Sequence, residues 1–249
     1  MNILIAEIKR SYNHYVKSIK FTLISILIMT LILFITLNNI TNKLEKYHEI
    51  IVILISIIFF LRILVSSLTF PINQISQEKN NRRMYMLSYL KYSFEYILTI
   101  RILINVFLNA TFSILFLLLI DLSLGDLYNL GYKSYLIIYV SSFIGMMSVA
   151  GVGLIVGAIQ IATGLKMTVI AIAQIVLFFF IFSYSSGSMF VPFSLSKILI
   201  YNILNHYQLD LIKLITNLFY IFLNSLVYYF VGWYTIKKLR LSTIKNNKL

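Results

Sequence analysis

The sequence predicts an all-α polytopic membrane protein with six transmembrane helices. Of the 249 residues, 60% are hydrophobic, more than a soluble domain tolerates on its surface. Two prolines and nine glycines favour long helices over the short alternating segments of a β-barrel. Six segments approach the roughly 20 apolar residues that cross the hydrocarbon core; they are 21–37, 50–70, 102–120, 135–159, 168–185 and 214–235. We expect residues 1–249 to form one transmembrane domain.

Residues 1–20 precede the first predicted span and read MNILIAEIKRSYNHYVKSIK. At helical spacing, Leu4, Ile8 and Tyr15 fall on one face, and Arg10 and Lys17 on the other. This pattern predicts an interfacial amphipathic helix that lies on the inner leaflet. No small-residue cleavage site follows the first span, so we expect that span to be retained.

A charged stretch separates the second and third predicted spans. Residues 77–101 read QEKNNRRMYMLSYLKYSFEYILTIR, and their basic residues cannot cross a bilayer. Wound as one helix, the stretch would align Tyr85, Tyr89, Tyr92 and Tyr96 in one stripe. The helix predicted here covers about residues 75–92. Ser93 is suited to cap a second helix that runs into the third span, which would divide the stripe. The stretch is either an amphipathic helix at the lipid interface or a docking element for a cytoplasmic subunit.

Another non-spanning stretch lies between the fifth and sixth predicted spans. Residues 185–213 read SSGSMFVPFSLSKILIYNILNHYQLDLIK. The Ser-Gly pair and Pro192 indicate a turn, and the apolar run 198–204 is too short to span. We expect an outer hairpin or a lipid-associated loop.

The distribution of charge predicts the orientation. If both termini are cytoplasmic, most of the 21 lysines and arginines lie on the inner side, and five of the eight acidic residues lie in outer loops. This asymmetry follows the positive-inside rule. An abundance of Ile, Asn, Lys and Tyr is typical of an AT-rich bacterial genome, so we expect a bacterial plasma membrane. Anionic lipid is the expected partner of the basic face, and nucleic acid is not.

Catalytic chemistry is not expected on this chain. It contains no G-x-x-x-x-G-K-[ST] phosphate-binding loop, so ATP hydrolysis would require another polypeptide. The zero cysteine count excludes thiolate chemistry. His14, His48 and His206 are far apart in the sequence, and we expect no metal site, no cofactor and no enzyme activity.

Several polar residues and two glycines lie inside predicted spans. The polar residues are Arg62, Asn105, Asn109, Gln174, Asn217 and Asn224. They either hydrogen-bond between helices or line a substrate pathway. Arg62 is about 12 Å from Phe70 at helical rise, so it is expected to snorkel inward, to pair, or to face that pathway. Gly153 and Gly157 form a G-x-x-x-G motif, which allows close helix packing within one chain or between two.

The order of these parts resembles the permease subunits of type-two ABC transporters over nearly the whole chain. Glu78-Lys79 resembles the acidic–basic start of the family's loop after the second span, and Leu87 and Leu90 resemble its leucine-rich middle. Arg101 stands where the family has a lysine, and residues 89–93 lack the family's proline. Ser186-Gly187 and Pro192 resemble the start of the family's outer segment.

The resemblance implies that the charged stretch is a coupling helix seated in a cleft of a partner ATPase. The candidate coupling residues are Glu78, Lys79, Arg82 and Arg83 for polar contacts, and Tyr85, Leu87, Tyr89 and Leu90 for packing. ATP and Mg would be bound by ATPase subunits, and a second permease, identical or a paralogue, would complete a dimer. The substrate would be amphipathic or hydrophobic: a peptide, an antimicrobial or a lipid-like molecule, as in bacteriocin immunity.

Two other functions remain open. A secondary carrier is disfavoured because the predicted spans lack carboxylates and broken helices. A membrane scaffold or sensor that binds a cytoplasmic partner is separable from an exporter only by finding an ATPase partner.

Overall fold

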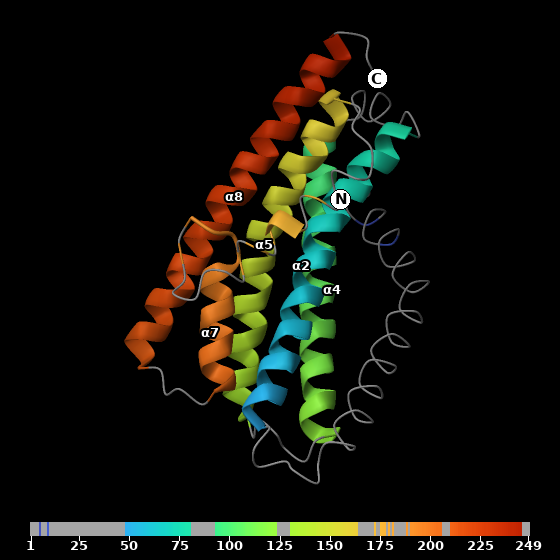
Figure 1. Cartoon of the computed structure of the whole chain (residues 1–249). Helices are drawn as coiled ribbons and strands as arrows, with labels where there is room; N and C mark the ends of the chain where they lie inside the picture. Colours follow the sequence, from blue (N-terminus) through green and yellow to red (C-terminus); the bar gives the residue numbers. More distant parts are fainter. Residues whose placement is uncertain are drawn as a thin grey trace.

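A computed structural model describes residues 48–80, 93–123, 130–163, 190–205 and 210–245, with residues 5, 9, 172, 175–177, 179, 181 and 188 besides. The described chain contains no strand. Its helices are α2 (His48–Asn80), α4 (Phe94–Ser123), α5 (Tyr132–Thr163), α7 (Ser194–Leu204) and α8 (Leu211–Lys245). Figure 1 shows four long helices side by side, with the shorter α7 next to α5 and α8.

Four of the described helices are long and apolar enough to cross a membrane: Ile55–Lys79, Phe94–Leu122, Tyr132–Thr163 and Leu211–Ser242. They correspond to the second, third, fourth and sixth predicted spans, and they confirm an all-helical chain with membrane-spanning character. The predicted spans 21–37 and 168–185 and the helix predicted at 1–20 lie outside the described residues, apart from single helical positions such as Ile5, Lys9 and Ile172.

Helix α2 is longer than the sequence pattern predicts. It continues without a break through Pro71 to Asn80, so the expectation that a separate helix begins near residue 75 is wrong. The helix runs ten residues beyond the predicted end of the span at residue 70. Pro71 lacks the N–H that would bond the carbonyl of Ser67, a loss that spans tolerate when neighbouring helices pack closely. A Cβ atom at Gly153 would lie 3.2 Å from Cγ of Pro71, so the ring packs against α5. Residues 81–92 are not among the described ones.

Helix α4 begins at Phe94, eight residues before the predicted span. Its first turn is capped as the sequence predicts, because the backbone N–H of Tyr96 donates to Oγ of Ser93 at 3.3 Å. The early start places Glu95 and Arg101 inside a helix that then runs to Ser123.

Helix α5 is the centre of the described bundle, in contact with α2, α4, α7 and α8. A Cβ atom at Gly232 would lie 2.3 Å from the carbonyl oxygen of Gly151, so α8 and α5 touch backbone to backbone. Gly153 and Gly157 face α2, where added Cβ atoms would meet the carbonyl oxygen of Leu68 at 2.7 Å and Cδ1 of Ile75 at 2.6 Å. The G-x-x-x-G motif therefore packs two helices of one chain.

Helix α7 is a short apolar helix that contains the run 198–204, where the sequence predicted an outer hairpin or a lipid-associated loop. It lies in the half of the bundle away from the C-terminus (Figure 1). Phe193 begins it with φ of 67°, and its backbone N–H donates to Oγ of Ser148 on α5 at 2.9 Å. Nζ of Lys197 donates to the carbonyl oxygen of Ile181 at 2.7 Å, and burial lowers the pKa of this lysine.

Candidate functional site

One end of the bundle carries buried ion pairs. This end, named here the C-terminal end, contains the last turns of α2, α5 and α8 and the first turns of α4 (Figure 1). Arg101 on α4 places Nη1 2.7 Å from Oε1 of Glu78 on α2, and the same nitrogen lies 3.3 Å from Oε1 of Gln74. Both ionic side chains are almost fully buried, so each charge depends on its partner.

A second pair joins the first turn of α4 to α8. Nε of Arg240 lies 3.0 Å from Oε1 of Glu95, out of line for a hydrogen bond, while Nη2 donates to Oε2 at 3.3 Å. The guanidinium also lies over the ring of Phe94, with Cζ 5.6 Å from the centroid. Both side chains are buried.

A third contact joins the end of α2 to α5. Nζ of Lys79 donates to the carbonyl oxygen of Ile161 at 3.1 Å, near the C-terminus of α5. A cation is favourable there because the last carbonyls of a helix carry partial negative charge. Residues 81–92 are flanked by Asn80, the last residue of α2, and Ser93, which precedes α4. The three contacts therefore fix the helix end on each side of this segment to the bundle.

Two of the predicted coupling residues can therefore be placed. Glu78 is 2% exposed and pairs inside the bundle, and Lys79 is partly buried. The other six lie outside the described residues: Arg82, Arg83, Tyr85, Leu87, Tyr89 and Leu90.

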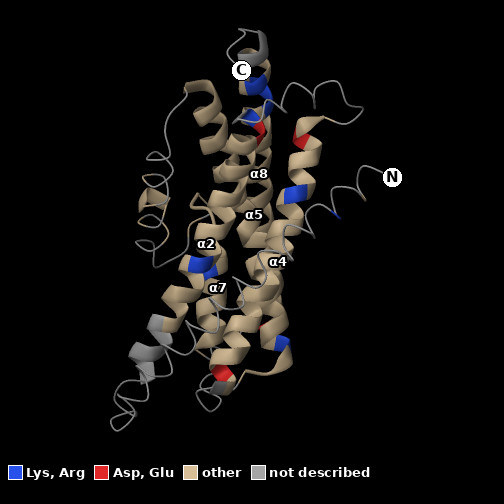
Figure 2. Cartoon of the chain, turned by 90° about the vertical axis from the view of Figure 1, so that its right-hand side faces the viewer, with Lys and Arg blue, Asp and Glu red and all other residues tan. Residues whose placement is uncertain are grey.

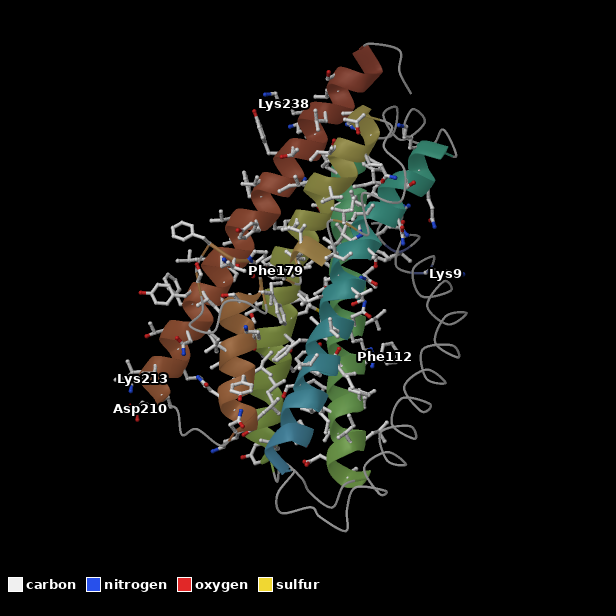
Figure 3. The ribbon with its side chains drawn as sticks, viewed as in Figure 1. Lys9, Phe112, Phe179, Asp210, Lys213 and Lys238 are labelled. Atoms are coloured by element: carbon white, nitrogen blue, oxygen red, sulfur yellow. The ribbon has the colours of Figure 1, made fainter. Side chains whose placement is uncertain are left out.

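The opposite end of α4 carries another buried polar contact. The hydroxyl of Tyr135 donates to Oδ2 of Asp121 at 2.6 Å, and Asp121 is 5% exposed. Arg101 and Asp121 are separated along α4 by about 30 Å at helical rise, the thickness of the hydrocarbon core. Figure 2 shows the charged residues mainly toward the two ends of the bundle. Figure 3 shows Lys238 near the C-terminal end of α8, with Asp210 and Lys213 at the other end.

Arg62 lies at a level between the Arg101–Glu78 pair and the Tyr135–Asp121 contact. Its guanidinium lies over the ring of Phe116 on α4, with Cζ 5.7 Å from the centroid, and its Nη1 atom is buried without a hydrogen-bond partner. Arg62 is about 24 Å from Glu78 along α2, and Phe116 is about 7 Å from Asp121 along α4. Helix α2 ends at Asn80, about 27 Å from Arg62 along the helix axis, and inward snorkelling of Arg62 remains a prediction.

The candidate pathway residues divide into two groups. Glu78 pairs with Arg101 and Arg62 lies on Phe116, so α2 and α4 run antiparallel. This register places Asn105 and Asn109 at levels between those two contacts, and Nδ2 of Asn109 donates to Oδ1 of Asn105 at 3.0 Å. Asn217 and Asn224 instead lie on α8, which packs mainly on α5. Gln174 lies outside the described residues.

A polar stripe on α2 was missed by the sequence analysis. It consists of Arg62, Ser66, Thr69, Asn73 and Gln77, at offsets 0, 4, 7, 11 and 15, and is named here the α2 polar stripe. At about 100° per residue these positions fall on one side of the helix. The periodicity is visible in the sequence, but a span boundary placed at residue 70 divided it. The acceptor Glu95 and its partner Arg240 were also missed, because nothing local in the sequence links them.

Comparison with models of protein families, with curated proteins and with solved structures gives no match to this chain.

Proposed function

We propose that this chain is the membrane-spanning subunit of an ATP-driven exporter of the ABC type. It moves an amphipathic or hydrophobic substrate across or out of a bacterial plasma membrane. ATP and Mg are bound by separate ATPase subunits on the cytoplasmic side, and a second permease completes the transporter. Both termini are cytoplasmic in this proposal, which makes the C-terminal end of the bundle the inner end.

The anchoring of the two helix ends that flank residues 81–92 is the observation that supports this proposal. The helix before the segment is tied to α4 by Glu78–Arg101 and to α5 by Lys79. The helix after it is tied to α8 by Glu95–Arg240. A partner that pushes on the segment would therefore displace several spans together, because packed cores transmit displacement instead of absorbing it. A coupling element needs this property.

The basic side chains at the same end support the orientation. Lys237 and Lys238 are exposed on the last turns of α8, and Nζ of Lys237 lies 5.1 Å from the ring centroid of Trp233. Tryptophan and lysine together are typical of a membrane interface. At the opposite end, Asp210 and Lys213 form an exposed pair with no net charge. Among the described residues, the C-terminal end carries the larger excess of lysine and arginine over acidic residues, as the positive-inside rule requires of an inner end.

A pull-down tests the proposal. The tagged chain is extracted from its native host in a mild detergent, and the proteins that accompany it are identified by mass spectrometry. The test variant replaces Arg82, Arg83 and Tyr85 with alanine. A matched control replaces the exposed Tyr132, Lys133 and Lys213 with alanine, which removes the same kinds of side chain from the opposite end.

The proposal predicts that a nucleotide-binding ATPase accompanies the wild type and the control but is lost from the test variant. If conditions that preserve a known ABC complex of the same host recover no ATPase, the exporter is contradicted. A secondary carrier or a scaffold would then be the better account.

A further inference from the structure

The α2 polar stripe lies on a part of a membrane-spanning helix that is not fully covered. Asn73 and Gln77 are exposed, and Arg62, Ser66 and Thr69 are partly buried. The stripe is about 22 Å long at helical rise. It begins near the C-terminal end of the bundle and ends at Arg62, beyond which the same face continues with the apolar residues Ile58 and Ile55.

The hydroxyl groups of the stripe are hydrogen-bonded within α2, which leaves Arg62 as its charged donor. Oγ of Ser66 donates to the carbonyl oxygen of Ile63 at 3.1 Å, and Oγ1 of Thr69 donates to that of Val65 at 2.7 Å. These hydroxyl protons are used within α2. The guanidinium of Arg62, in contrast, has a buried nitrogen with no acceptor.

A charged group at membrane depth is costly unless it is paired. The ring of Phe116 provides a cation–π contact with Arg62, but a ring does not accept the planar pair of hydrogen bonds that a guanidinium offers. A phosphate or a carboxylate does, and it also neutralises the charge. Arg62 is therefore suited to an oxyanion.

The apolar surroundings of Arg62 favour an oxyanion that is attached to a hydrocarbon chain. Val65 follows Arg62 by less than one turn of α2, and Leu115 and Leu119 flank Phe116 on α4. All three are large apolar side chains with 40%, 43% and 44% exposure. A hydrocarbon chain can lie against such a surface, whereas a free ion gains nothing from it.

We propose that the α2 polar stripe binds the oxyanion headgroup of an amphipathic molecule, with Arg62 as its anchor and the hydrocarbon chain in the lipid. The headgroup moves along the stripe between the C-terminal end of the bundle and Arg62. Its charge therefore stays in contact with polar side chains and does not enter hydrocarbon. This deepens the proposed function, because it assigns an anionic amphiphile as the substrate class. The binding step itself requires no ATPase.

Native mass spectrometry of the purified chain tests the proposal. The chain is held in a non-ionic detergent and exposed to phosphatidylglycerol and phosphatidylcholine with identical acyl chains, and the retained lipid is counted. Phosphatidylglycerol supplies the anionic headgroup, and phosphatidylcholine is its zwitterionic match. The variants are Arg62→Gln and Arg62→Lys. Lys213→Gln is the matched control, because it removes one positive charge from an exposed site at the far end of α8.

We expect the wild type and Lys213→Gln to retain phosphatidylglycerol in preference to phosphatidylcholine. Arg62→Gln should lower that retention about tenfold, and Arg62→Lys should lower it less, because a lysine preserves the charge but not the planar pair of hydrogen bonds. Excess inorganic phosphate should not displace the lipid. Arg62→Gln removes an unpaired buried charge, so its thermal stability should not fall, and a loss of binding cannot be assigned to unfolding.

Equal retention by Arg62→Gln and wild type would overturn the proposal, as would equal retention of the two lipids. Displacement by inorganic phosphate would identify a free-anion site and would also contradict an amphiphile. A further pair of variants tests the path. Asn73→Leu removes an exposed amide donor from the stripe and should weaken retention, whereas Ile57→Leu alters an exposed apolar residue on another face and should not. Recovery of an ATPase with Arg62→Gln is expected to be normal, so failure here leaves the proposed function standing.

Discussion

Glu95 and Arg240 are 145 residues apart in the sequence, yet their side chains form a buried ion pair with Nε and Oε1 3.0 Å apart. The pair joins the first turn of α4 to the last turns of α8. With Glu78 and Arg101, which are 23 residues apart and 2.7 Å from each other, it makes the start of α4 a link between α2 and α8. Residues 81–92 stand between α2 and α4 in the sequence, so the helix ends that flank them belong to this link.

Removing one partner of the Glu95–Arg240 pair should destabilise the chain strongly. Glu95→Gln leaves the guanidinium of Arg240 buried without a counter-charge, which costs about 3–5 kcal/mol. The exchange Glu95→Arg with Arg240→Glu should recover a large part of that loss, because the charges are paired again. The free energy of unfolding in mixed micelles measures both variants.

The exposed pair Asp210–Lys213 provides the control for that experiment, since its atoms lie 3.5 Å apart with both side chains more than 70% exposed. Asp210→Asn should change the free energy of unfolding by less than about 1 kcal/mol. If Glu95→Gln changes the free energy of unfolding by as little as Asp210→Asn does, the buried pair contributes little to stability.

Adding one methyl group at the α5–α8 contact should also be costly. Gly232→Ala places a Cβ atom 2.3 Å from the carbonyl oxygen of Gly151, so the two backbones must separate, at about 1–3 kcal/mol. Gly131→Ala is the matched control, because nothing lies within 4 Å of its added Cβ. Thermal unfolding of the two variants in detergent measures the difference, and equal melting temperatures would mean that the helices are not in backbone contact.

The two glycines of the G-x-x-x-G motif should differ in how well they tolerate alanine. The distances from an added Cβ atom to its nearest neighbour are nevertheless similar at the two positions. An added Cβ at Gly153 meets the backbone oxygen of Leu68 at 2.7 Å, whereas at Gly157 it meets Cδ1 of Ile75 at 2.6 Å. The end of an isoleucine side chain can rotate away, and a helix backbone cannot. Gly153→Ala should therefore cost about 1 kcal/mol more than Gly157→Ala. The reverse order of melting temperatures would contradict this packing of α2 on α5.

Ser148 should be required for the start of α7. Its hydroxyl accepts the backbone N–H of Phe193 at 2.9 Å, and both residues are buried. Ser148→Ala leaves that N–H without an acceptor, at about 1–3 kcal/mol. Thr163→Ala removes an exposed hydroxyl bonded only within its own helix and is expected to change the free energy of unfolding by less than about 0.5 kcal/mol. Equal effects of the two substitutions would exclude a special role for Ser148.

The all-helical class and four helices long and apolar enough to span a membrane could be predicted from the sequence, because length and apolar content decide them. The boundaries were less accurate, and α2 shows the physical reason. Its last nine residues are mostly polar and follow Pro71, which locally favours an end to the helix. Packing on α5 and the pairing of Glu78 hold this part in the helix, and neither contact is visible locally.

The candidate site was predictable to a smaller extent for the same reason. Arg62, Asn105 and Asn109 stood out in the sequence as polar residues within apolar runs. The structure places all three on α2 and α4, which pack side by side. The partner of Arg101 could not be chosen from the sequence, because several acidic residues were equally available. The residues given as coupling contacts from 82 to 90 remain predictions.

The central claim is that residues 81–92 bind an ATPase, and site-directed photocrosslinking tests it most directly. A benzophenone amino acid replaces Tyr85 in the chain expressed in its native host, and a matched substitution replaces the exposed Tyr132 at the opposite end of the bundle. The account predicts that irradiation joins position 85, and not position 132, to a protein with a nucleotide-binding domain. Crosslinks from position 85 to lipid alone, in cells where the chain is correctly inserted, would contradict it and would make the segment an interfacial anchor.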